Sequence, residues 1–94
     1  MVDMTHINGK EKGNIRLFAL STCVWCKKTK KLLDTLHVAY DYIFVDLLDG
    51  EEKDGIIEEV KKWNPRCSFP TLVLNNKDSI VGFKEELIRK KLES

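Results

Sequence analysis

The sequence predicts an α/β fold with the element order β-α-β-α-β-β-α, in which a mixed four-stranded sheet carries helices on both faces. Short runs rich in apolar, β-branched and aromatic residues alternate with longer stretches of helical period, which is the first observation behind this prediction. The second is the succession of strand, helix and strand, because such a crossover is right-handed and makes its two strands parallel. The third is a short turn between the last two strands, which adds them to the sheet as an antiparallel hairpin.

The first half of the predicted domain contains a strand, a helix and a second strand. The first strand is the buried run IRLFAL at residues 15–20. The helix that follows has an apolar face and a lysine-rich face, and Ser21 or Thr22 is expected to cap its first turn. The second strand is predicted over residues 39–47 (AYDYIFVDL), where Asp46 is expected to cap the following loop.

The second half contains a helix, a hairpin and a last short helix. Helical period runs over residues 50–63, with an acidic start and a basic end that suit the helix dipole, and Asn64-Pro65 stops it. The segment 71–83 (TLVLNNKDSIVGF) predicts a β-hairpin that turns at Asn75-Asn76. Residues 84–92 are expected to form the last helix.

Composition and charge exclude several classes of protein. A net charge of +1 is too small for nucleic acid or an anionic membrane to be the main partner. No apolar run approaches the roughly 18 residues that span a bilayer. Residues 1–13 are polar, so we expect no export signal there, and we predict a flexible extension to a domain at residues 14–94. Three cysteines fit a reducing compartment, and the expectation is a cytoplasmic monomer.

Two cysteines, Cys23 and Cys26, lie three positions apart where the first strand gives way to the first helix. Unpaired backbone N–H groups and the helix dipole favour a negative charge at that place, so Cys23 is expected to react as a thiolate. Cys26 lies one turn along, close enough to attack a mixed disulfide formed at Cys23. The pair therefore predicts thiol–disulfide exchange, with Cys23 as nucleophile and Cys26 as resolving thiol.

A zinc site is the competing interpretation of the same pair. Zinc needs two further ligands, and Cys67 with His37 or His6 are the candidates in this chain. Neither histidine belongs to a second paired motif, and a Cys-x-x-Cys pair in a β-α-β context favours redox chemistry. No metal and no cofactor are expected.

Pro70, in the segment RCSFPTL, immediately precedes a predicted strand. An ordinary trans proline that begins an edge strand explains it most simply, and a cis proline is the alternative. With TCVWC at residues 22–26, SFPTLVL at 68–74 and IVGF at 80–83, the chain resembles the glutaredoxin family of the thioredoxin superfamily over about residues 15–92.

The resemblance implies a thioredoxin-like fold and a dithiol oxidoreductase that acts on disulfide-containing protein substrates. It also implies that Pro70 is cis and faces the disulfide, and that the backbone of Phe69 pairs with the main chain of the substrate. Trp25 is expected to offer a hydrophobic landing surface for a protein partner. The residues expected to bind substrate are Thr22, Trp25, Phe69, Pro70, Gly82 and Phe83.

Three departures from the family bear on the electron donor. Glutathione-dependent members usually have a lysine where this chain has Leu20, and an acidic residue where it has Lys84; the usual Thr-Val-Pro reads Ser68-Phe69-Pro70. The stretch IVGFKEEL resembles redoxins that serve ribonucleotide reductase and are recharged by a flavin thioredoxin reductase. The expected donor is therefore a flavin disulfide reductase or a low-molecular-weight thiol, and not glutathione alone.

Some glutaredoxins instead carry an iron–sulfur cluster between two chains through the nucleophilic cysteine. They usually have a single active-site cysteine followed by Gly-Phe-Ser, and Cys26 departs from that pattern. An iron–sulfur or zinc carrier that uses the same cysteines is the alternative function.

Overall fold

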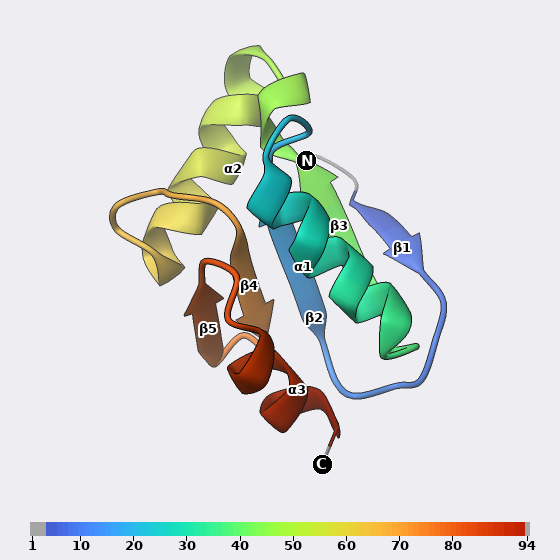
Figure 1. Ribbon diagram of the computed structural model, residues 1–94. Helices are drawn as coiled ribbons and strands as arrows, with labels where there is room; N and C mark the ends of the chain where they lie inside the picture. The colour runs from blue at the N-terminus through green and yellow to red at the C-terminus, as the bar shows by residue number, and fades with distance from the viewer. Residues whose placement is uncertain (1–3, 94) are drawn as a thin grey trace.

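The computed structural model describes residues 4–93 of the chain. Its elements in chain order are β1 (Thr5–Ile7), β2 (Ile15–Ala19), α1 (Val24–Thr35), β3 (Tyr40–Phe44), the 3-10 helix η1 (Val45–Leu47), α2 (Gly50–Trp63), β4 (Thr71–Leu74), β5 (Asp78–Val81) and α3 (Glu85–Glu93). The strands form one sheet in the order β1-β3-β2-β4-β5 (Figure 1). β2 and β3 are parallel, as the crossover predicts, and the other neighbouring strands are antiparallel.

The sheet has five strands rather than the four predicted. The additional strand, β1, lies in the polar segment that was expected to be an extension, and it pairs with β3 so that Thr5 faces Tyr42 and Ile7 faces Tyr40. His6 Nδ1 lies 2.7 Å from Asp41 Oδ1 across the same pair of strands. A polar strand of three residues is too short to show a periodic apolar pattern in the sequence. β1 is held in the sheet by its pairing with β3. The domain boundary at residue 14 stays a prediction.

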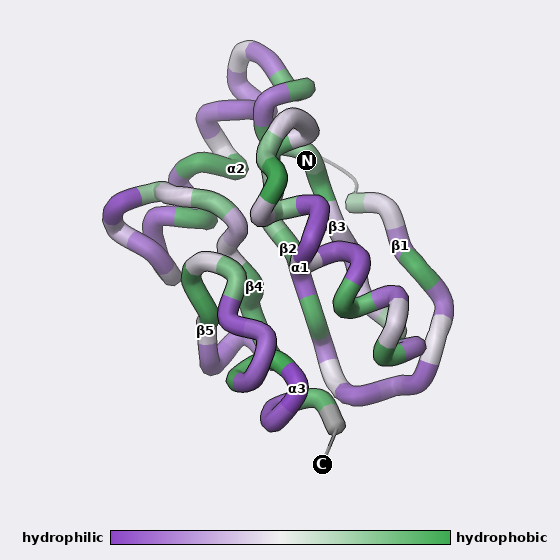
Figure 2. The backbone as a smooth tube through the Cα atoms, viewed as in Figure 1, coloured by the Kyte–Doolittle hydropathy of each residue, from purple (hydrophilic) through white to green (hydrophobic). Residues whose placement is uncertain are grey.

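Helices cover both faces of the sheet, which confirms the predicted fold class. Leu17 of β2 belongs to a core that also contains Leu33 of α1 and Ile88 of α3. Phe18, the next residue of β2, belongs to a second core with Val60 of α2. Successive side chains of a strand point to opposite faces, so α1 and α3 cover one face and α2 covers the other. In Figure 2 the peripheral segment between β1 and β2 is mainly hydrophilic.

Two predicted boundaries are corrected. The strand expected over residues 39–47 ends at Phe44, because the chain turns into η1, where Val45 is buried and Leu47 is 69% exposed. The first helix is not capped by Ser21 or Thr22; its N-cap is Cys23. The hairpin turn is confirmed, because Asn75 and Asn76 both have positive φ (56° and 51°), as a type I′ turn requires. Within residues 4–93, none of the helices has both the length and the apolar character of a membrane crossing.

Candidate active site

Cys23 occupies the N-terminal cap of α1 and is partly exposed. Its backbone is extended (φ −85°, ψ 121°), and its Sγ accepts a hydrogen bond from the N–H of Cys26 at 3.3 Å. The sulfur therefore satisfies one of the N–H groups that a helix leaves unpaired at its start. A negatively charged sulfur at this place is stabilised by that donor and by the helix dipole.

Cys26 is buried, with 1% of its surface exposed, and its Sγ accepts a hydrogen bond from the N–H of Leu20 at 3.4 Å. Burial, followed by the hydrogen bond with Cys23, raises the pKa of Cys26 to about 12. Both cysteines are free thiols in this structure. The two sulfurs thus differ as the predicted roles require: one is accessible at the helix end, and the other stays protonated beneath it.

This difference predicts which thiol is alkylated. Because the raised pKa keeps Cys26 protonated below pH 10, iodoacetamide at pH 7 to 9 is expected to modify Cys23 and to leave Cys26 unmodified in the folded protein. Peptide mapping by mass spectrometry of a Cys67→Ser variant measures this, with the same protein in denaturant as the control in which both thiols react. Equal modification of the two cysteines in the folded protein would contradict the assignment.

A groove of about 270 Å³ is lined by Trp25, Phe69, Pro70, Gly82 and Phe83. The Phe69–Pro70 peptide is cis, as the resemblance implies, and the simpler trans interpretation is wrong. The N–H of Gly82 donates to the carbonyl of Pro70 at 2.9 Å, which joins the two loops of the groove. Five of the six residues expected to bind substrate therefore come together, and Thr22 lies exposed in the turn before Cys23.

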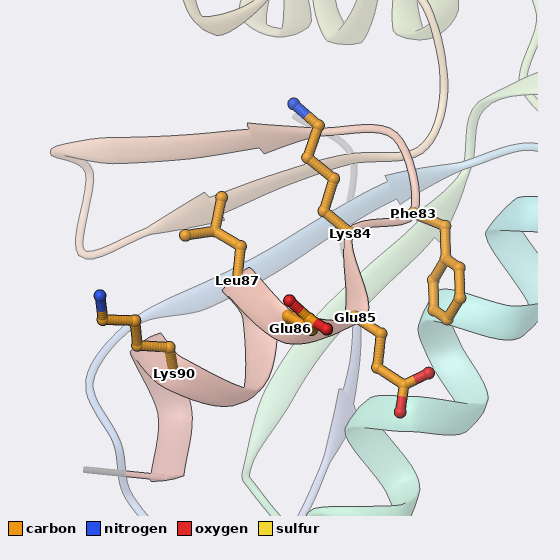
Figure 3. Close-up of a pocket in the computed structure, with 6 residues that line it drawn as sticks. All are labelled: Phe83, Lys84, Glu85, Glu86, Leu87 and Lys90. Atoms are coloured by element: carbon orange, nitrogen blue, oxygen red, sulfur yellow. The ribbon is translucent and has the colours of Figure 1, made fainter.

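Trp25 and Phe83 form an aromatic pair over this groove. Their ring centroids are 6.2 Å apart at an interplanar angle of 25°, and Trp25 is 55% exposed. The ammonium of Lys28 lies 4.6 Å from the Trp25 ring centroid. Figure 3 shows the Phe83 ring directed toward α1, whereas the side chain of Lys84 points away from α1. A partly exposed aromatic pair beside Cys23 is the kind of surface that protein partners use as an anchor.

The loop that carries Pro70 is held by Asn64, a role that the sequence did not indicate beyond a helix stop. Asn64 is 5% exposed, and its Nδ2 donates to the carbonyl of Ser68 (3.0 Å), to Ser68 Oγ (2.9 Å) and to Thr71 Oγ1 (3.2 Å). Its Oδ1 accepts from the N–H of Arg66 at 3.2 Å. One buried amide therefore fixes both ends of the turn that presents Phe69 and Pro70.

A second missed residue is Asp46, which was expected to cap its own loop. Its carboxylate instead accepts from Ser21, with Oδ1 2.8 Å from the backbone N and Oδ2 2.6 Å from Oγ. These two hydrogen bonds lower the pKa of Asp46. No local signal could reveal this contact, because the two residues are 25 positions apart and meet only when β2 and β3 pair.

The ligands considered for zinc are not assembled with the cysteine pair. His6 contacts Asp41 in the sheet, and Cys67 has positive φ (51°) in the loop after α2, where its N–H donates to the carbonyl of Asn64. In the part of the chain that the structure describes, no group of three or more His, Cys, Asp and Glu side chains could hold a metal ion.

A Cys-x-x-Cys pair at a strand-to-helix junction, beside a cis-proline loop on a mixed sheet with helices on both faces, defines a dithiol protein of the thioredoxin-like fold. Residues 15–79 match the family model described as Glutaredoxin. The chain belongs to the glutaredoxin family, whose members act on disulfides with the help of reductants.

Solved structures of archaeal proteins share the fold over almost the whole chain. Methanoredoxin of Methanosarcina acetivorans is 55% identical with a TM-score of 0.89, covering 92% of this chain and 90% of that one. The glutaredoxin of Methanosarcina mazei Go1 is 48% identical with a TM-score of 0.90, covering 99% and 90%. A glutaredoxin-like 8.6 kDa protein of the rubredoxin operon of Clostridium pasteurianum is 29% identical over 79 residues, covering 84% of this chain and 97% of its own length.

Proposed function

We propose that this protein is a dithiol thiol–disulfide oxidoreductase that reduces disulfides of proteins or small molecules through Cys23 and Cys26. The observation that carries the proposal is the pairing of a partly exposed Cys23 sulfur at the cap of α1 with a buried Cys26 sulfur one turn below. The groove of Trp25 and Pro70 supports it, because that groove offers a surface for the substrate beside the nucleophile. A cytoplasmic location and a monomeric state belong to the same proposal.

The reaction needs only the two thiols and a substrate disulfide. The Cys23 thiolate attacks one substrate sulfur, the substrate S–S bond breaks, and the departing substrate sulfur takes up a proton. Cys26 then gives its proton to solvent and attacks the Cys23 sulfur, so that the Cys23–Cys26 bond forms and the second substrate thiolate leaves with the electron pair. The substrate gains two electrons, and a donor must return two electrons to the protein disulfide.

The proposed donor is a flavin disulfide reductase or a low-molecular-weight thiol, and not glutathione alone. The side chain of Leu20, where family members that use glutathione usually have lysine, packs against both cores. Phe83 stacks on Trp25. The groove next to Cys23 therefore offers an aromatic contact, and its two usual charged contacts to glutathione are replaced by an apolar residue and by Lys84.

A comparison of donors under anaerobic conditions tests this proposal. Oxidised protein in a Cys67→Ser background is mixed with glutathione, with another small thiol, or with a flavin thioredoxin reductase and its reduced nicotinamide, and free thiols are labelled over time. We expect the reductase or the non-glutathione thiol to reduce the pair at least about tenfold faster than glutathione. Fast reduction by glutathione would overturn the donor assignment, and failure of the reduced protein to reduce any disulfide would overturn the function itself.

Lys84 gives a matched variant for the same assay. Lys84→Asp restores the acidic character usual in the family and is expected to raise the rate with glutathione by about two- to fivefold, since an exposed charge at a binding rim has a modest effect. Lys90→Asp makes the same change of charge within α3, six residues further along the chain, and is the control (Figure 3). Equal rates for the two variants would show that the charge at residue 84 does not select the donor.

A further inference from the structure

The pairing of β2 with β3 brings two loops together at the active-site end of the sheet. These strands are parallel, and Ala19 at the end of β2 lies opposite Phe44 at the end of β3. The residues that follow each strand are therefore neighbours: Ser21 begins the turn that leads to Cys23, and Asp46 lies in η1. The Asp46 carboxylate accepts hydrogen bonds from both the backbone N–H and the hydroxyl of Ser21, so each of its oxygens contacts that turn.

The backbone of Leu20, the residue before Ser21, contacts both cysteines. The peptide unit that Asp46 holds has its N–H on Ser21, which donates to Asp46, and its C=O on Leu20, which accepts from the N–H of Cys23 at 3.2 Å. The preceding N–H, that of Leu20 itself, donates to Cys26 Sγ at 3.4 Å. The Cys23 sulfur takes its hydrogen bond from inside α1, but the Cys26 sulfur takes its hydrogen bond from the turn.

We propose that Asp46 is a positioning residue for the resolving step: by holding the Leu20–Ser21 peptide, it keeps the Cys26 sulfur directed for attack on Cys23. The inference rests on the proposed function, because a resolving step exists only if a mixed disulfide forms at Cys23. It assigns to Asp46 no proton transfer and no contact with substrate. The nucleophilic step is expected to depend little on Asp46, since the donor to Cys23 Sγ lies within the helix.

The charge of Asp46 acts on Cys26 in the opposite direction. Hydrogen bonds from Ser21 keep the pKa of Asp46 low, so the carboxylate is ionised at neutral pH. After burial and the contributions of Cys23, the negative charge of Asp46 adds to the raised pKa of Cys26. Removing only the charge of Asp46 should therefore speed the resolving step, whereas removing its hydrogen bonds with Ser21 should slow that step. Asparagine and alanine at position 46 separate the two effects, because only asparagine keeps an oxygen for the Ser21 N–H.

An aromatic disulfide, dithiobis(nitrobenzoic acid), separates the two steps in one experiment. Attack by Cys23 forms a mixed disulfide and releases one thionitrobenzoate at a rate that depends on reagent concentration. Attack by Cys26 then closes the Cys23–Cys26 bond, loses its proton to buffer and releases the second thionitrobenzoate at a rate independent of reagent concentration. Stopped-flow absorbance in a Cys67→Ser background records both releases.

We expect Asp46→Ala to slow the second release by about tenfold and to change the first by less than about threefold, the size of effect that loss of hydrogen bonds to a charged group produces. Asp46→Asn should leave the second release as fast as in the parent protein or faster. Ser21→Ala keeps the charge and removes only the hydroxyl contact, so a slowing of about threefold is expected. The control is Asp49→Asn, because Asp49 makes no side-chain hydrogen bond to the start of α2 and its loss removes the same charge nearby.

Three results would overturn the assignment of Asp46. They are an unchanged second release in Asp46→Ala, an equal slowing of both releases, and a slowing in Asp49→Asn as large as that in Asp46→Ala. If Asp46→Ala does not fold, as circular dichroism would show, an unchanged second release in Ser21→Ala overturns it instead. Failure of the proposed function is distinct, because the folded parent protein would then release no second thionitrobenzoate at all.

Discussion

Replacement of Cys23 by serine is expected to lower the disulfide-reductase activity of the protein by a factor on the order of 10³ or more. The serine hydroxyl does not ionise near neutral pH and cannot form a disulfide, so no mixed disulfide can begin the reaction. The loss cannot be rescued by Cys26, because its sulfur is buried and its pKa is raised to about 12. The Cys23 sulfur is the one that meets solvent at the helix cap.

Reduction of a protein disulfide in the presence of excess donor measures this loss. Cys67→Ser is the matched control, since it removes one thiol of the chain outside the pair and should retain activity. Cys26→Ser gives a different signature: the first attack still occurs, and a mixed disulfide with the substrate accumulates that mass spectrometry detects. Activity above about a tenth of the parent value in Cys23→Ser would show that another group is the nucleophile.

Asn64→Ala is expected to lower the free energy of unfolding by about 2 to 3 kcal/mol, because the variant loses several buried hydrogen bonds at once. The Nδ2 contacts to Ser68 and Thr71 disappear, and the N–H of Arg66 loses its side-chain acceptor. Alanine also leaves space at a residue that is 5% exposed. The turn that carries the cis Pro70 then loses its main internal support, so a weaker interaction with substrate is expected as well.

Urea unfolding followed by circular dichroism measures the change in stability. Ser68→Ala is the control, because it removes only the Oγ partner of Asn64 while the carbonyl of Ser68 still accepts from Asn64 and from Thr71 Oγ1. A loss of about 0.5 to 1.5 kcal/mol is expected there. If Asn64→Ala were no less stable than Ser68→Ala, the buried amide would not be what holds the loop.

The second predicted helix and the predicted hairpin show why parts of the fold can be predicted from local sequence. The second helix was predicted over residues 50–63 and is α2 over the same range, because its acidic start, apolar spacing and the Asn64-Pro65 stop all act within a few residues. The hairpin at Asn75-Asn76 was equally readable, since the positive φ of a tight turn selects asparagine locally. β1 had no such signal and was missed.

The cysteine pair was also predicted from local spacing, and the structure places Cys23 at the start of the first helix, as expected, with Cys26 one turn along. The groove around it depended on more than pattern. Trp25 and Phe83 stack although they are far apart in the chain, and only the resemblance to a family suggested that the two loops meet. Pattern alone favoured a trans peptide before Pro70, whereas the peptide is cis.

What the sequence by itself determined was the α/β class and most of the helices and strands, and it predicted which two cysteines form the reactive pair. These follow from interactions between residues a few positions apart, such as helical spacing, turn chemistry and the placement of Cys23 at a strand-to-helix junction. Only the tertiary structure decided the pairing of the fifth strand, the hydrogen bonds of the Asn64 amide and the hydrogen bonds from Ser21 to Asp46. Each of these features consists of hydrogen bonds between polar groups that show no periodic pattern in the sequence. The groups meet only because the sheet and the buried core bring their segments together.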